Sequence, residues 1–243
     1  MIATRARLPI DLSRRNSIIT PTSFVRELVS LEFDNAFNPY SHRCAVHDRE
    51  DAPRLRSESL RAMLETAGEY DIDSIWIGRD LGYRGGRRTG LAFTDDVHLD
   101  AHGARWGIPV PRPTKGGMVA ERTAFIVWDI LSRVKDPVFL WNVFPLHPHE
   151  ADNPFSNRPH TPLERKAGEE FLSQVISLLR PRRLIAIGND AARTVNRLFE
   201  HGAVIQVRHP SYGGQTRFLA QVADLYELCE PRQGVFCFGD AGA

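Results

Sequence analysis

Residues 74–78 read Ser74-Ile75-Trp76-Ile77-Gly78, a short and almost wholly apolar run that leads directly into a segment rich in glycine and arginine. Three further runs of this kind follow at 138–142, 184–188 and 203–207. Strands with apolar residues at nearly every position are typical of a parallel sheet that is covered on both faces. Segments with helical spacing alternate with these runs, and this alternation predicts an α/β fold.

Helices are predicted around these strands by the spacing of apolar residues and by capping signals. The clearest signal is Thr161-Pro162-Leu163-Glu164, a capping box with proline at the first helical position. The helices are expected at 54–70, at 121–134, from 161 to 180, and from about Asn189 to a residue before Gly202. We therefore predict a single three-layer αβα domain with a central parallel sheet of about four strands and helices on both faces.

The length of 243 residues fits one large α/β domain or two small ones, and no low-complexity linker divides the chain. We assign residues 21–230 to one domain, 1–20 to an arginine-containing arm and 231–243 to a tail. A poorly ordered arm, a transit peptide and a DNA-touching arm are the alternatives for the first segment. The formal net charge of +1 argues against a histone-like binder of polyanions but leaves room for a local basic face.

Cysteine usage and hydropathy narrow the class further. The three cysteines, Cys44, Cys229 and Cys237, indicate a reducing compartment and cannot supply four thiolates to an iron–sulfur cluster. There is no run of 18 apolar residues, so no membrane span is expected. The arm has no apolar core of the kind that a secretory signal needs. We expect a cytoplasmic protein.

Polar segments follow three of the predicted strands, at the edge of an open α/β sheet where ligands bind. Residues 78–94 hold five glycines, four arginines and one carboxylate, a composition that suits an anionic ligand or a solvated loop. Asn142 ends the second strand, where an amide is costly unless it is hydrogen-bonded or caps the next loop. His209-Pro210-Ser211-Tyr212 follows the fourth strand.

Two histidines in the middle segment, His147 and His149, suggest a metal site only weakly. Pro148 between them makes the segment rigid and extended, and no third ligand is evident. They either line the site or shape the loop. We expect neither a metal nor an organic cofactor.

The three polar segments together resemble the motifs of the uracil-DNA glycosylase superfamily. They are a glycine-rich stretch from Gly78 to Gly90-Leu91-Ala92-Phe93-Thr94, an asparagine at a strand end, Asn142, and a final His209-Pro210-Ser211. The chain resembles in particular a bacterial subgroup. The residues that carry this likeness are Asn38-Pro39-Tyr40, Gly82-Tyr83-Arg84-Gly85, residues 141–149 and Asn157-Arg158, so the match covers roughly 36–223.

The resemblance implies a monofunctional, monomeric glycosylase of the bacterial cytoplasm, acting at the nucleoid. It would flip uracil out of single- or double-stranded DNA and hydrolyse the N-glycosidic bond, with other deaminated bases as further candidates. The implied catalytic residues are Asp80, Asn142 and His209. The implied base-binding residues are Gly78, Gly82, Tyr83, Phe93 and Asn142. The implied DNA contacts are Arg84, Arg87, Arg88, Ser211 and Tyr212.

Each implied role has a chemical reason. Phe93 would stack on the flipped base, and Asn142 would accept from N3–H of uracil and donate to O4. His209 would donate to O2, where negative charge develops as the base leaves. Asp80 would position water or stabilise the sugar cation. Tyr212 would fill the vacated stack.

The chain also departs from the resembled pattern. It has Arg79-Asp80-Leu81 where the subgroup has Glu-Ala-Pro, and Gly213-Gly214 where an apolar insert is usual. Gly82 replaces a tyrosine that excludes thymine in the classical enzymes, so a roomier base pocket is expected. A DNA-binding or damage-sensing protein without turnover is the main alternative. A nucleoside-processing enzyme is a third.

Overall fold

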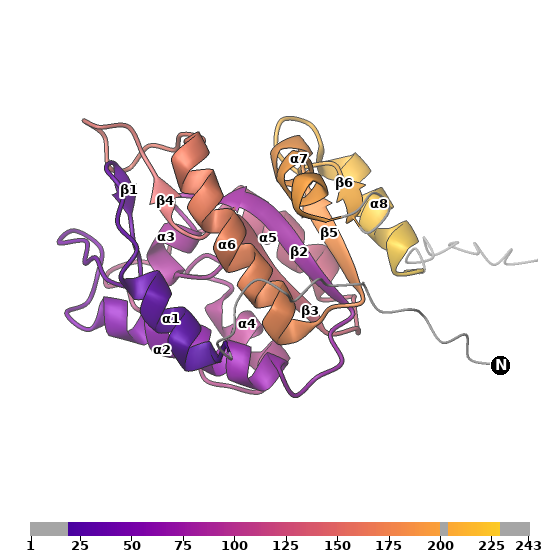
Figure 1. Cartoon of the computed structure of the whole chain (residues 1–243), viewed down its shortest axis with the longest axis horizontal. Helices are drawn as coiled ribbons and strands as arrows, with labels where there is room; N and C mark the ends of the chain where they lie inside the picture. The colour runs from indigo at the N-terminus through magenta and orange to yellow at the C-terminus, as the bar shows by residue number, and fades with distance from the viewer. Residues whose placement is uncertain (1–18, 200–203, 229–243) are drawn as a thin grey trace, which may run out of the picture.

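A four-stranded parallel sheet forms the centre of the computed structural model, which describes residues 19–199 and 204–228 (Figure 1). Its strands are β2 (Ser74–Asp80), β3 (Val138–Phe144), β5 (Arg183–Ile187) and β6 (Val204–Val207), in the order β3-β2-β5-β6. Each of them overlaps one of the four predicted apolar runs. The arm up to residue 18, Ala203 at the predicted start of the last strand, the tail 231–243, Cys229 and Cys237 lie outside the described residues.

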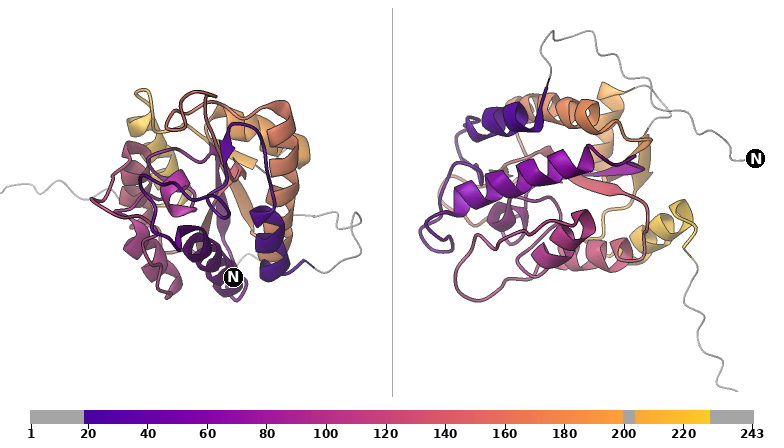
Figure 2. Two further views of the ribbon diagram at one scale, coloured as in Figure 1. Left: turned by 90° about the vertical axis from the view of Figure 1, so that its left-hand side faces the viewer. Right: turned by 90° about the horizontal axis from the view of Figure 1, so that it is seen from below.

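Helices cover both faces of the sheet, which confirms the three-layer prediction (Figure 2). One face carries α1 (Pro21–Val29), α2 (Ala52–Ala67), α6 (Pro162–Leu179) and α7 (Asn189–Leu198), with α4 (Leu99–Trp106) beside α2. The other face carries α5 (Arg122–Leu131) and α8 (Gln215–Leu225).

Alternation along the strands divides the core into two layers. Ile75 and Ile77 of β2 point into the core under α2 and α6, and Trp76 points into the core under α5 and α8. All three side chains are fully buried. The two-sided burial explains why these strands are apolar at nearly every position.

Caps set the ends of the longest helix as predicted. The Thr161 hydroxyl accepts from the Glu164 amide at 3.2 Å, and the Glu164 carboxylate accepts from the Thr161 amide at 2.6 Å. A second capping box at the start of α1, between Thr20 and Ser23, was not predicted. Nor were α4, α8 and the one-turn helix α3 (Gly86–Thr89).

A small second sheet ties the N-terminal segment to the loop that follows β3. Its two strands, β1 (Ala36–Phe37) and β4 (His147–Pro148), pair antiparallel. Just beyond β1, the Asn38 amide donates to the carbonyls of Leu28 and Leu31 at 2.8 and 2.9 Å, and the Tyr40 hydroxyl donates to the Gly90 carbonyl at 2.7 Å. The Asn-Pro-Tyr segment therefore braces the glycine-rich segment.

No helix in the described parts of the chain is long and apolar enough to cross a membrane.

Candidate active site

The carboxyl ends of β2 and β3 bring Gly78, Phe93 and Asn142 together. Gly78 lies opposite Asn142 in the parallel register. A Cβ atom built on Gly78 would lie 2.3 Å from Asn142 Oδ1 and 2.5 Å from Phe93 Cζ. The amide and the ring therefore converge on the Gly78 Cα, and only glycine allows that approach.

The Asn142 amide is buried, with 3% of the residue exposed, and it makes no hydrogen bond to another described residue. Buried amides are almost always hydrogen-bonded within the protein. The unpaired donor and acceptor of Asn142 are therefore available to a ligand. Phe93 has a φ of 53°, an unusual value for a bulky residue. Its carbonyl accepts from Trp128 Nε1 at 3.0 Å, which anchors the strained residue to α5.

His209 follows β6 at the same edge of the sheet. The Ser211 amide donates to His209 Nδ1 at 3.1 Å, so the ring proton is placed on Nε2. Burial, together with the charges of Arg79 and Arg208, lowers the pKa of His209 to about 4. At neutral pH the ring is therefore an uncharged donor through Nε2. Gly188, with a φ of 91°, leaves room for it: a Cβ there would lie 3.1 Å from His209 Cβ.

Asp80 ends β2, and both of its carboxylate oxygens have protein partners. Oδ2 accepts from Arg79 Nε at 2.5 Å, and Oδ1 contacts His160 Nδ1. Arg79 also reaches Asp190 of α7 at 3.1 Å. The sequence analysis missed His160: in the loop after β3 it considered only His147 and His149. Its position directly before the capping box of α6, at the end of a Pro- and His-rich loop, was the available signal.

Arg87 and Arg88 are not at the surface, which corrects their prediction as phosphate contacts. Each is 3% exposed. The Arg88 guanidinium donates to Asp96 at 2.6 and 2.9 Å, and the Arg87 guanidinium lies over the rings of Phe37 and Phe155, at 4.1 and 4.9 Å from their centroids. The glycine-rich segment turns back into α3, so these side chains point inward and fix the loop.

The other predicted DNA contacts are accessible. Arg84 is exposed, Ser211 is half-buried, and Tyr212 is 98% exposed with a φ of 53°. The Ser211 hydroxyl lies 3.3 Å from that of Thr123 near the start of α5. The Tyr83 amide donates to Asn157 Oδ1 at 3.0 Å, which joins the first motif to the loop after β3.

Glu121, at the start of α5, fills the space beside Gly82. A Cβ on Gly82 would lie 2.8 Å from Glu121 Oε1, and one on Gly85 would collide with Oε2. Burial raises the pKa of Glu121 to about 7, with Asp95 adding to the rise and Arg84 opposing it. The roomier pocket expected from Gly82 is therefore occupied in part by a carboxyl group that the sequence analysis did not identify.

Burial also keeps two other histidines uncharged. It lowers the pKa of both His102 and His147 to about 3. His102 Nδ1 is 2.9 Å from the Thr94 hydroxyl, and His147 Nε2 is 2.8 Å from the Ser156 carbonyl. The rings of His147 and His149 stack, with centroids 5.8 Å apart. Within 19–199 and 204–228, no three His, Cys, Asp or Glu side chains are grouped so that they could hold a metal ion.

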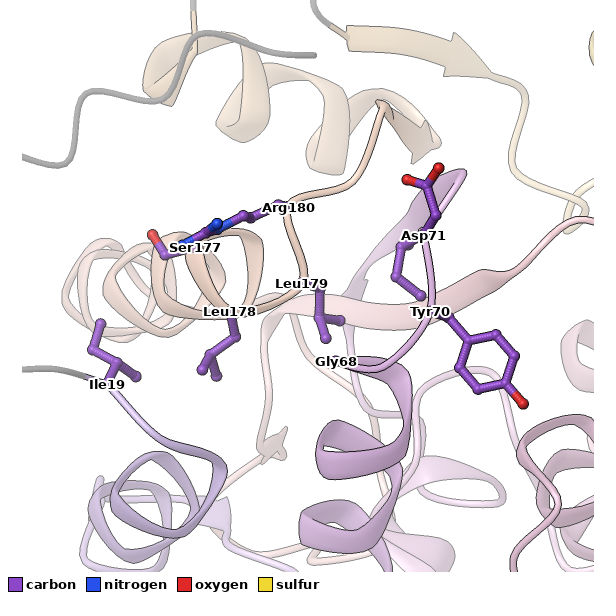
Figure 3. A pocket seen from close by; sticks show the side chains of 9 residues that line it. Ile19, Gly68, Tyr70, Asp71, Ser177, Leu178, Leu179 and Arg180 are labelled. Carbon is purple, nitrogen blue, oxygen red and sulfur yellow. The ribbon is translucent and has the colours of Figure 1, made fainter.

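A hollow of about 340 Å³ lies elsewhere, between the end of α2 and the end of α6 (Figure 3). Its lining includes Tyr70, Asp71 and Arg180. These residues precede β2 and β5, so the hollow is at the amino ends of the strands. Ligands of open parallel sheets bind at the carboxyl ends, and the polar residues described above gather there.

Comparisons with known proteins agree with this fold. A family model described as the uracil DNA glycosylase superfamily matches residues 65–228. Among solved structures, the chain is similar to wild-type SMUG2 of Pedobacter heparinus, with a TM-score of 0.60 and 14% sequence identity, over 86% of this chain and 98% of that chain. At this identity the likeness shows a shared fold. No curated protein matches the chain.

Proposed function

Because the chain belongs to the uracil DNA glycosylase superfamily, we propose that it removes uracil from DNA by hydrolysing the N-glycosidic bond. The observation that carries this proposal is the convergence of the Asn142 amide and the Phe93 ring on Gly78. A buried amide with free hydrogen-bonding groups would destabilise a plain apolar core. Beside an aromatic ring it can instead read the edge of a flipped base.

The amide and the ring have distinct tasks. Phe93 offers a face for stacking to a base that has left the helix. Asn142 Oδ1 accepts from N3–H of uracil, and Nδ2 donates to O4. Cytosine presents an acceptor at N3 and a donor at N4, so the same amide would face two mismatched groups. This pairing favours uracil, and the same logic extends to other deaminated bases with the same edge.

Bond cleavage places negative charge on the base and positive charge on the sugar. The uncharged His209 ring donates from Nε2 to O2 of uracil, where the charge of the leaving base gathers. The Asp80 carboxylate, at the end of β2, stabilises the sugar cation. A water molecule then completes the hydrolysis.

The surface residues of the same edge supply the DNA contacts. Arg84 and Ser211 contact backbone phosphates, and Tyr212 enters the gap that the flipped base leaves. The 98% exposure of Tyr212 supports this role, because an aromatic side chain gains nothing from the protein in that position. We propose that the protein acts as a monomer on single- and double-stranded DNA.

The test uses a single-stranded oligonucleotide with one uracil. After incubation with the protein, alkali should cleave the strand at that position, because an abasic site is alkali-labile. Asn142→Ala should abolish most of the cleavage, and an oligonucleotide with cytosine in place of uracil should stay intact, because cytosine presents the reversed donor and acceptor. Tight binding of the uracil strand without alkali-labile sites would refute the proposal and favour a damage-sensing protein.

A further inference from the structure

Water activation in the proposed hydrolysis needs a group that can take a proton. Asp80 stands in the position expected for it, but its two oxygens already accept hydrogen bonds from Arg79 and His160. Arg79 is held in turn by Asp190, so this contact is part of a network that crosses from β2 to α7. Each oxygen therefore has a protein partner, and the carboxylate keeps the negative charge that stabilises the sugar cation.

In His160, unlike Asp80, only one of the two polar side-chain atoms has a partner among the described residues. Its Nδ1 faces the Asp80 carboxylate, which fixes the ring proton on Nδ1 and leaves a lone pair on Nε2. Nε2 makes no hydrogen bond to any residue that the structure describes. The side chain is 9% exposed, and its ring meets Phe144 edge-on at 6.2 Å. A carboxylate on Nδ1 with an unbonded Nε2 is the geometry of a histidine general base.

The backbone around His160 holds this ring in place. Thr161, the next residue, is the N-cap of α6. Arg158, two residues earlier, donates to both oxygens of Glu164 at 2.7 and 2.8 Å and to the His149 carbonyl at 2.9 Å. A base presented from a fixed helix start keeps the geometry that proton transfer requires.

We propose that His160 is the general base for the attacking water and that Asp80 is its positioning residue. In the step, one water O–H bond breaks and its proton goes to His160 Nε2, while the water oxygen bonds to C1′ of the deoxyribose. The C1′–N1 bond breaks, and its electron pair leaves with uracil. The O2 atom of uracil accepts a hydrogen bond from His209 Nε2. Asp80 stabilises the imidazolium, which returns its proton to solvent. This inference rests on the proposed function.

The experiment measures single-turnover uracil removal by the full chain. His160→Ala should lower the rate about 100-fold or more, the scale of one general base, with affinity for a uracil-free oligonucleotide within twofold of wild type. His160→Asn can keep a donor toward Asp80 but has no basic nitrogen, so it should be as slow as His160→Ala. Added imidazole should raise the rate of His160→Ala at least tenfold and should leave the rate of Asn142→Ala unchanged. The matched control is His149→Ala, which should keep the wild-type rate.

Three results would overturn the assignment. His160→Asn within threefold of wild type would mean that the side chain serves only to hold Asp80. A slow His160→Ala that imidazole does not rescue would mean that the ring serves only the fold. A protein–DNA species that survives detergent would show that Nε2 attacks the sugar itself. If the wild type does not remove uracil, the proposed function is wrong as well. If the wild type removes uracil and the His160 variants remove it at the same rate, only the His160 assignment is wrong.

Discussion

Replacing Gly78 with alanine tests whether the amide and the ring form one binding site. The new Cβ would lie 2.3 Å from Asn142 Oδ1 and 2.5 Å from Phe93 Cζ, where an ordinary contact is at least 3.4 Å. The amide must then retreat by 3.4 − 2.3 = 1.1 Å, and the ring by 3.4 − 2.5 = 0.9 Å. A displacement of about 1 Å in a positioning group lowers a rate about 100-fold. Overpacking should also lower the free energy of unfolding by about 1–3 kcal/mol.

The assay is single-turnover uracil removal from a single strand, quantified by alkaline cleavage, with thermal unfolding measured on the same samples. Gly117→Ala is the matched control, because a Cβ there meets nothing within 4 Å. It should keep the wild-type rate. If Gly78→Ala removed uracil within threefold of wild type, Asn142 and Phe93 would not act together on the base, and the geometric reasoning would be wrong.

Three further predictions use the same protein. Asn142→Asp should slow uracil removal ten- to a hundredfold, because a carboxylate cannot donate to O4 and an unpaired buried group costs about 1–3 kcal/mol; a rate within threefold of wild type would contradict the base-reading role. Arg84→Ala should flatten the slope of log affinity against log salt by about one unit. Arg88→Ala should leave that slope unchanged, because Arg88 is buried. Between pH 7.5 and 5.5, urea unfolding should show a net stability loss of about 2 kcal/mol. About 4 kcal/mol is lost because three histidines, whose folded pKa values are lowered to about 3 or 4, protonate only on unfolding. About 2 kcal/mol is regained by Glu121, because its raised folded pKa of about 7 favours proton uptake by the native state. Glu121→Gln should therefore increase the loss to about 4 kcal/mol, and stability independent of pH would refute these assignments. The three histidines are His102, His147 and His209.

The sequence predicted the sheet well because the signals for it are local. Each buried strand is an uninterrupted apolar run, and the capping box of α6 lies within four consecutive residues. The three motifs could be placed at one edge because parallel strands end together. By contrast, β1 and β4 have two residues each, too few to show any period.

The failed prediction for Arg87 and Arg88, and the two site residues that were missed, concern side-chain contacts that the sequence does not show. Arginine in a glycine-rich segment suggested phosphate binding, but the inward turn of α3 directs Arg88 to Asp96 and Arg87 to two aromatic rings. The partner of Asp80, His160, lies 80 residues away. Glu121 reaches Gly82 only because α5 begins beside the first motif. Neither residue type nor spacing indicates such pairs.

The brace on the glycine-rich segment, from Tyr40 to the Gly90 carbonyl and from Arg88 to Asp96, has a consequence for the choice of substrate. A loop that is fixed before DNA arrives loses little conformational entropy on binding. Opening the base pair is then the main free-energy cost of recognition, and it falls on the DNA. Excision rates should therefore follow the ease of extrusion: uracil in a single strand first, uracil opposite guanine next, and uracil opposite adenine last.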